Sequence, residues 1–242
     1  DQLPRRLLPP RYRLARGGAG EGLEPVLDSA GYAHFPRAFE SADLLQLLEA
    51  HDNGQAGERI ANCEPLSDWL SHSPEVAGLL GKIGHVNSRP VRAILFDKGP
   101  TTNWVLGWHQ DRTICVKKRV ETEGYGPFTT KAGLVHVEPP FELIEGMATV
   151  RFHLDPVDGS NAPLRIAVGS HKVGKIPARE ETPIARRSDI VACYAEADNT
   201  WACSTPILHS SERSQSAGQR RRVLQVDFSP DSLKGGLDWL GI

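Results

Sequence analysis

The sequence predicts a mainly β protein with a helical N-terminal third, folded as a double-stranded β-helix (a cupin-like jelly roll) that is backed by helices. Apolar residues recur at helical spacing in the first third, and eight short apolar or alternating runs follow beyond about residue 90. No internal repeat or low-complexity linker divides the chain, which at 242 residues can bury a full core. We therefore expect a single domain over 23–242, preceded by a surface arm over 1–22 that is rich in Arg, Pro and Gly.

Two stretches of the first third have the spacing and end signals of helices. In "ESADLLQLLEAHDNG", Ser41 is the expected N-cap and Gly54 the expected stop. In "SHSPEVAGLLGKIG", Ser73 is expected to cap the helix and Pro74 to take its first position. Before them, residues 23–36 are expected to form a short helix that leads into a strand.

The eight later runs are punctuated by Gly, Pro, Asn or Asp at many of their boundaries, as expected for short strands. They read "VRAILFD", "NWVLGWH", "RTICVKK", "MATVRFHL", "PLRIAVG", "DIVACYA", "TPILHSS" and "RRVLQVDFS". The segment over 117–146 lies among them and is long and irregular, so it is predicted to be a lid or a binding loop.

Composition excludes several classes of protein. With 39% hydrophobic and 24% charged residues and a net charge of −2, the chain gives no reason to expect a nucleic-acid or membrane partner. Its apolar runs are too short to cross a bilayer, and the arm lacks the apolar centre of a secretory signal. The four cysteines are scattered without a CxxC pair, which is typical of reduced thiols in a cytoplasmic protein.

The chemistry begins at "GWHQDRT" over 107–113. In a strand, His109 and Asp111 point to the same face, because side chains alternate. This pair alone is weak, but His209 ends another strand-like run farther along the chain. Two histidines and one carboxylate on one face of a metal form the facial triad of non-haem Fe(II) oxygenases, which leaves positions for a cosubstrate and O₂. The sequence therefore predicts an iron site.

A cluster of arginines after the second histidine suits 2-oxoglutarate as the cosubstrate. Its distal carboxylate needs a partner, and the planar guanidinium matches a carboxylate with two donors. In "QRRRVLQVDF", alternation places Arg221 on one face of the strand and Arg220 and Arg222 on the other. The residues themselves leave open which face points inward.

Together these pieces resemble the phytanoyl-CoA dioxygenase family of Fe(II)/2-oxoglutarate-dependent oxygenases. The resemblance extends from about residue 23 to the end of the chain. It rests on "GYAHFP", "WHQD", "RFHLDPVDGSNAPLRIAVGSHKVG" and "LHSSERSQSAGQRRRVLQVDFS". It implies a double-stranded β-helix in which His109, Asp111 and His209 are the catalytic iron ligands.

The resemblance also implies residues for the cosubstrate. Counting back from the end of the final strand matches the 2-oxoglutarate arginine to Arg221, whereas counting forward from the distal histidine matches it to Arg220. We prefer Arg221, because insertions are easier in loops than in strands. Ser211 matches a position that often helps to bind the same carboxylate, and Asn103 and Arg151 are weaker candidates.

One departure from the family and one agreement with it are informative. The family often has Asn-Gly where this chain has Asn161-Ala162, which bears on the conformation of that turn. A halogenating branch replaces the metal carboxylate with a small residue, whereas Asp111 is present here. The resemblance therefore favours hydroxylation or another oxidation of a small-molecule substrate over halogenation.

The pocket and its substrate are less defined by the sequence. Four aromatic residues are candidates for the pocket wall, namely Trp104, Trp108, Tyr125 and Phe128. Arg112 and Lys117, beside the metal strand, suggest an anionic substrate. Two other classes stay open: a non-catalytic metal-binding β-helix protein, and a zinc hydrolase, since the same ligands bind Zn²⁺ and would need no buried arginine.

Overall fold

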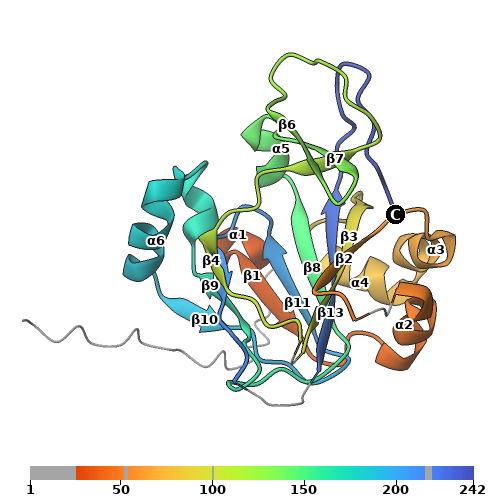
Figure 1. Cartoon of the computed structure of the whole chain (residues 1–242), viewed down its shortest axis with the longest axis vertical. Coiled ribbons are helices and arrows are strands. Elements are labelled where there is room, and N and C mark those ends of the chain that lie inside the picture. Colours follow the sequence, from red (N-terminus) through yellow and green to blue (C-terminus); the bar gives the residue numbers. More distant parts are fainter. Residues whose placement is uncertain (1–25, 52–53, 100, 216–219) are drawn as a thin grey trace, which may run out of the picture.

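Two antiparallel sheets that share a cavity carry the fold, and a third, smaller sheet lies at one end (Figure 1). The computed structural model describes residues 26–51, 54–99, 101–215 and 220–242, so the expected arm over 1–22 lies outside the described residues. The largest sheet, here the major sheet, has six strands in the order β1-β11-β8-β13-β3-β2. Their bounds are β1 Tyr32–Phe35, β2 Gly57–Ile60, β3 Arg89–Lys98, β8 Ala148–His153, β11 Thr200–Ser204 and β13 Arg221–Ser229.

The second, or minor, sheet has four strands in the order β10-β9-β12-β4, and the third has three in the order β5-β7-β6. The minor strands are β4 Leu106–His109, β9 Leu164–Ala167, β10 Ile190–Ala192 and β12 His209–Ser211. The third sheet consists of β5 Ile114–Val116, β6 Phe128–Lys131 and β7 Leu134–Val137. Two facing antiparallel sheets built from distant strands are the arrangement expected of a double-stranded β-helix.

Helices cover the outer face of each of the two large sheets (Figure 1). The helical segments are α1 Val26–Ala30, α2 Ser41–Leu47, η1 Glu49–His51, α3 Glu64–His72, α4 Pro74–Lys82, α5 Phe141–Glu145, η2 Ser170–Val173 and α6 Ala178–Arg187. Helices α2, α3 and α4 pack on the major sheet, and α6 packs on the minor sheet. Each sheet is thereby left with one face for the cavity between them.

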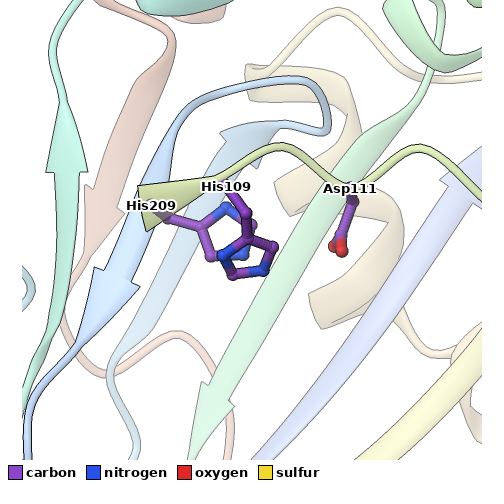
Figure 2. A group of neighbouring side chains, drawn as sticks. All are labelled: His109, Asp111 and His209. Atoms are coloured by element: carbon purple, nitrogen blue, oxygen red, sulfur yellow. The ribbon is translucent and has the colours of Figure 1, made fainter. Parts of the chain in front are cut away.

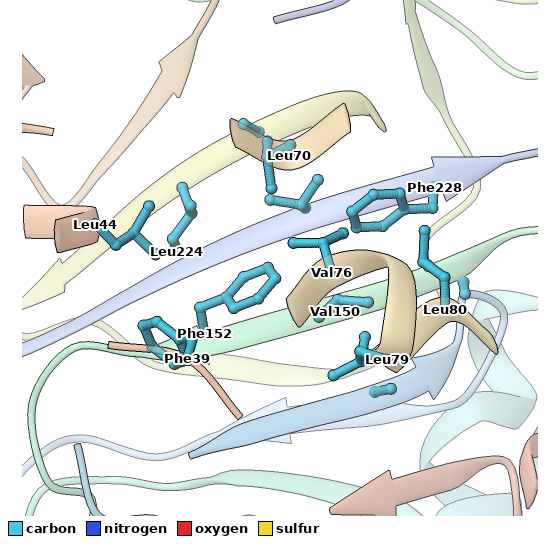
Figure 3. Close-up of a cluster of buried hydrophobic side chains, with 14 of the residues drawn as sticks. Phe39, Leu44, Leu70, Val76, Leu79, Leu80, Val150, Phe152, Leu224 and Phe228 are labelled. Atoms are coloured by element: carbon cyan, nitrogen blue, oxygen red, sulfur yellow. The ribbon is translucent and has the colours of Figure 1, made fainter. Parts of the chain in front are cut away.

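The main core lies between the major sheet and these helices (Figure 3). Leu224, Val226 and Phe228 alternate along β13 and are fully buried on its outer face. Phe152 of β8 joins them, with its ring edge-on to Phe39 at 5.3 Å between centroids. The intervening residues of β13 point the other way, because successive side chains in a strand alternate. The same alternation therefore builds a dry core outside and a polar cavity inside.

The predicted strands and the predicted first-third helices are only part of the architecture. Each of the eight runs contains a strand, and "GYAHFP" contains β1. However, the first third mixes its helices with two strands, because β1 and β2 pair at the two edges of the major sheet. The segment over 117–146, expected to be an irregular loop, contains β6, β7 and α5. Within the described ranges its strands pair with each other and with β5, which a local pattern does not reveal.

The two predicted helix caps had different outcomes. Ser73 caps α4 as expected, since its hydroxyl accepts a hydrogen bond from the Val76 amide at 3.2 Å, and Pro74 is the first helical residue. The prediction for Ser41 was wrong, because Ser41 is already the first residue of α2. Its amide donates instead to the carboxylate of Asp198, 157 residues away, at 2.7 Å. A tertiary contact has replaced the local cap.

Two expectations from composition are addressed by the structure. All four cysteines are free, as the absence of a CxxC pair suggested, and Cys115, Cys193 and Cys203 are buried. None of the helices in the described ranges has the length and apolar character that crossing a membrane would need.

Candidate metal centre

The two histidines of the predicted triad are direct partners across a strand pair. His209 of β12 lies opposite His109 of β4, and their ring centroids are 4.2 Å apart. Asp111 follows two residues after β4 ends and turns its carboxylate toward the same space (Figure 2). One ligand atom from each of the three residues lies within 4.8 Å of the others. The structure therefore brings together the three residues predicted to hold a metal.

Gln110 lies between His109 and Asp111, and its side chain anchors the backbone of this segment after β4 ends. Its side chain points away from the triad and is 5% exposed. The amide donates to the carbonyls of Gly174 and Pro206 at 3.0 and 2.8 Å, and its oxygen accepts from the Ile176 amide at 2.8 Å. This anchor was missed in the sequence, where a glutamine between two ligands carries no visible signal.

Both imidazoles are oriented by their own backbone. Nδ1 of His109 contacts the Gly107 carbonyl at 2.8 Å, and Nδ1 of His209 contacts the Ile207 carbonyl at 3.0 Å. A carbonyl oxygen can only accept, so these contacts place the proton on Nδ1 and leave the Nε2 lone pair available. This is the second-sphere hydrogen bond that commonly orients metal-binding histidines.

The electrostatics favour the protonation states that a metal ion requires. Burial and the neighbouring His109 lower the pKa of His209 to about 4, so this imidazole is neutral near pH 7. Burial raises the pKa of Asp111, but the nearby positive charges, foremost that of Arg92, outweigh it and lower the pKa below its ordinary value. Neutral imidazoles and an ionised carboxylate are the forms that bind a divalent cation.

A buried ion-pair chain supports Asp111 from behind. Arg92 on β3 reaches the Asp111 carboxylate at 3.4 Å and the Asp227 carboxylate at 2.5 Å. The other oxygen of Asp227 accepts a hydrogen bond from the Thr149 hydroxyl at 2.9 Å. Arg92 thereby links the major sheet to the triad and limits where the Asp111 carboxylate can lie.

A cavity of about 420 Å³ opens beside the triad, between the major and minor sheets. Arg221 lines it and is only 3% exposed. Its guanidinium donates to the Ala162 carbonyl, while its Nε has no hydrogen-bond partner in the described part of the chain. Arg220 and Arg222 point elsewhere, since they pair with the carboxylates of Asp97 and Asp155. The middle arginine is thus the one that faces the cavity.

Ser211 also lines the cavity, with a lysine that sequence reasoning missed directly behind it. Lys98 is 1% exposed, and its ammonium donates to the Ser211 hydroxyl at 3.2 Å and to the Glu212 carbonyl at 2.6 Å. Burial and the charges of Arg221 and Arg151 lower the pKa of Lys98 to about 8. The sequence did contain one signal for this lysine. Lys98 ends an alternating run and lies two residues after Phe96, so both side chains are on the face of β3 that Phe96 presents to the cavity.

The two weaker cosubstrate candidates lie in different places. Arg151 lines the cavity, is 5% exposed and donates to the side-chain oxygen of Gln225. Asn103 is not among the cavity-lining residues, and its amide exchanges two hydrogen bonds of 2.8 Å with the backbone of Ser214. Arg151 is therefore close to a ligand in this cavity, whereas the side chain of Asn103 joins two loops.

Of the residues predicted to form the pocket wall or to bind an anionic substrate, some line the cavity and others lie outside it. Of the four aromatic residues, Trp104 lines the cavity, whereas Trp108, Tyr125 and Phe128 pack in apolar clusters elsewhere. Arg112 lines the cavity but is paired with Glu181 at 2.5 Å, and Lys117 is exposed outside it.

Several solved structures share this fold. The non-heme α-ketoglutarate-dependent epimerase SnoN from nogalamycin biosynthesis matches over 87% of this chain and 87% of its own, with a TM-score of 0.59 and 15% identity. HygX from Streptomyces hygroscopicus, with nickel and 2-oxoglutarate bound, matches over 85% of each chain with a TM-score of 0.53 and 13% identity. AviO1 from Streptomyces viridochromogenes Tue57 matches over 84% of this chain and 91% of its own, with a TM-score of 0.54 and 16% identity.

No protein-family model matches the chain, and no curated protein matches it either. The resemblance to the phytanoyl-CoA dioxygenase family therefore stays a prediction. At 13–16% identity the structural matches establish the fold alone. The chain has the antiparallel double-stranded β-helix fold that SnoN and HygX share, and within it a His-Asp-His cluster with metal-binding geometry.

The ion-pair chain behind Asp111 gives a prediction for stability. Replacing Arg92 by Met leaves Asp227, whose side chain is 2% exposed, without its partner, and lowers the free energy of unfolding by about 3–5 kcal/mol. Urea denaturation measures this change. In the control R119M, the lost pair with Glu121 is 65% and 74% exposed, so the change stays within about 1 kcal/mol. Equal losses in both variants would contradict the structural role of Arg92.

Proposed function

We propose that the protein is an Fe(II)- and 2-oxoglutarate-dependent dioxygenase that hydroxylates or otherwise oxidises a small-molecule substrate. One observation carries the proposal: the His109–Asp111–His209 cluster opens onto the same cavity as Arg221, a buried arginine without a carboxylate partner among the described residues. A metal site needs the cluster of three ligands, and a dicarboxylate cosubstrate needs the buried arginine.

The donor set fits a ferrous ion. Two neutral imidazoles and one carboxylate supply three of the ligands of a non-haem Fe(II) centre and leave the other positions open. His109 and His209 each keep an Nε2 lone pair, because Nδ1 is engaged with a backbone carbonyl. The anchored Gln110 and the ion pair with Arg92 keep the backbone and the carboxylate of the HxD segment in place without contributing a ligand.

The other side of the cavity fits the distal carboxylate of 2-oxoglutarate. Arg221 offers an Nε donor that has no partner among the described residues, and Ser211, whose hydroxyl accepts from Lys98, lines the same cavity. Arg151 adds a second buried positive charge nearby. When both are bound, the ferrous ion and 2-oxoglutarate would supply an oxidant derived from O₂, with release of succinate and CO₂. The residues of this chain bind, orient and shield the reactants.

The structural neighbours support a small-molecule substrate, with no nucleic acid as a partner. SnoN has been solved with Fe³⁺, α-ketoglutarate and nogalamycin RO, and HygX with nickel, 2-oxoglutarate and hygromycin B. We extend this to the chain as a proposal, together with membership of the phytanoyl-CoA dioxygenase family and a cytoplasmic location. A zinc hydrolase is less well supported, because it has no use for the buried Arg221.

Turnover of 2-oxoglutarate tests the function directly. The Fe(II)-loaded protein, supplied with O₂ and 2-oxoglutarate, is expected to form succinate even without a substrate, at a slow uncoupled rate measurable by chromatography. Replacing His209 by Ala lowers this rate by about a hundredfold or more, because a direct metal ligand is lost. The control H72A changes a side chain that is 74% exposed and keeps the wild-type rate. Iron-loaded wild-type protein that forms no succinate, with or without candidate substrates, would favour a non-catalytic metal-binding protein.

The assignment of Arg221 to 2-oxoglutarate binding is tested with the adjacent Arg220 as the control. R221Q is expected to weaken 2-oxoglutarate binding by about ten- to a hundredfold, the value of hydrogen bonds to a charged group. R220Q, which alters an arginine paired with Asp97 away from the cavity, should bind nearly as the wild type does. Calorimetric titration of the iron-loaded protein without O₂ measures both. A larger loss in R220Q would reverse the assignment.

The low pKa of Lys98 predicts a pH dependence. In the free protein the ammonium loses its proton near pH 8, whereas the negative charge of a carboxylate bound at the neighbouring Arg221 favours the charged form. Binding of 2-oxoglutarate should therefore take up a proton above pH 8, and its affinity should fall by up to about tenfold per pH unit there. Calorimetry in buffers of different ionisation enthalpy detects the proton. K98M should remove both effects, and K82M, at the exposed end of α4, should keep them.

A further inference from the structure

The balance of charge in the cavity exceeds what the proposed cosubstrate needs. Six basic residues line it, whereas Asp111 is the one carboxylate among the described lining residues. Arg92 and Arg112 are paired with carboxylates. The remaining four, which form no ion pair within the part of the chain that the structure describes, are Arg59, Lys131, Arg151 and Arg221.

These four cations fall into two groups on different sides of the cavity. Arg151 and Arg221 belong to the central strands β8 and β13, and we have placed the 2-oxoglutarate carboxylate there. Arg59 belongs to β2, the edge strand, and pairs with Ile94, which in turn pairs with Gln225. Arg59 is therefore two strands across and four residues along from Arg221, roughly 17 Å between α-carbons. One small dicarboxylate at Arg221 leaves Arg59 without an anion.

Lys131 of the third sheet lines the same cavity as Arg59, and the charges of both act on His136. Lys131 ends β6 opposite Leu134 and is exposed where it lines the cavity. His136, on the neighbouring strand, also lines the cavity, and burial together with the charges of Arg59, Arg92 and Lys131 lowers its pKa. Its ring nitrogens contact the Leu134 carbonyl at 3.0 Å and the Cys115 sulfur at 3.1 Å. His136 is thus an uncharged part of the cavity wall near the charged side chains of Arg59 and Lys131.

We infer that Arg59 and Lys131 form a second anion-binding subsite, which takes a carboxylate or phosphate group of the substrate. Nε of Arg59 is buried and finds no hydrogen-bond partner among the residues that the structure describes, and burying such a donor is unfavourable until a ligand satisfies it. The planar fork of arginine and the point charge of lysine both suit an oxyanion. Identifying this anion as the substrate rests on the proposed function. An oxyanion held here would leave the rest of the molecule directed along the cavity toward the triad.

The test compares small aromatic probes that differ in charge. Phenylacetate, phenyl phosphate and the neutral phenylacetamide are titrated calorimetrically into Fe(II)-loaded protein that is saturated with 2-oxoglutarate and free of O₂. We expect at least one of the two anions to bind about tenfold or more tightly than the amide. The stronger of the two anions identifies the oxyanion. R59Q and K131Q should each reduce this preference, and the double variant should abolish it.

Matched controls separate a local subsite from general charge. K117Q and R186Q remove exposed cations that do not line the cavity, and both should keep the preference. R59K should keep part of it, because the charge stays while the fork is lost. Circular dichroism confirms that each variant is folded. The inference is overturned if the folded wild type shows no preference for either anion, or if the folded double variant keeps it.

The two proposals can fail separately. If 2-oxoglutarate binds but neither anion is preferred over the amide, the second subsite is wrong and the proposed function stands. If 2-oxoglutarate does not bind, the proposed function is wrong, and the probes are titrated into the metal-loaded protein alone. The subsite is then supported if the preference is lost in R59Q/K131Q and kept in R221Q, and it is overturned by the opposite result.

Discussion

The site depends on one strand pairing, that of β12 with β4, which places His209 opposite His109. These residues are 100 positions apart in the sequence (209 − 109), so no local preference brings them together. A slip of one residue would turn an imidazole to the other face of the sheet. β12 is also held on its far side, where His209 pairs with Ile166 of β9, a residue with no exposed surface in the apolar core between the sheets. The hydrophobic core thus fixes the register on which the metal geometry depends.

The two faces of the major sheet have opposite energetic roles. The outer face packs apolar side chains against α2, α3 and α4, and it provides the stability of the fold. The inner face carries buried cations that repel each other: burial and the charge of Arg151 lower the pKa of Arg221 to about 9. Such a face is unfavourable in the free protein and becomes favourable when anions bind. The cationic inner face therefore lowers the stability of the free protein and raises its affinity for negatively charged ligands, as is common at functional sites.

The features that could be predicted from the sequence are those that local periodicity and residue type determine. Eight of the later strands follow from apolar or alternating runs, whereas β6, β7 and β11 were missed. The HxD pair with a distant histidine indicated the residues that gather at the centre. What the sequence did not reveal depends on pairing between distant segments. The role of Gln110 requires the carbonyls of Gly174 and Pro206, and the burial of Lys98 requires Ser211. β2 was missed for a similar reason: it is polar, and it is a strand because it pairs with β3.

The turn at Asn161-Ala162 shows how backbone strain positions the charged side of the cavity. Ala162 has a φ of +61°, the left-handed region that glycine adopts freely and that costs another residue roughly 1–2 kcal/mol. The Asn161 side chain holds this turn by accepting from the Asp158 amide at 3.0 Å and donating to the Pro156 carbonyl at 2.8 Å. The Ala162 carbonyl accepts from both Arg221 and the Ser211 hydroxyl. The strained residue therefore holds both the Arg221 and the Ser211 side chains in place at the wall of the cavity. Because alanine does not adopt the left-handed region as freely as glycine does, the conformation of this turn is imposed by these contacts.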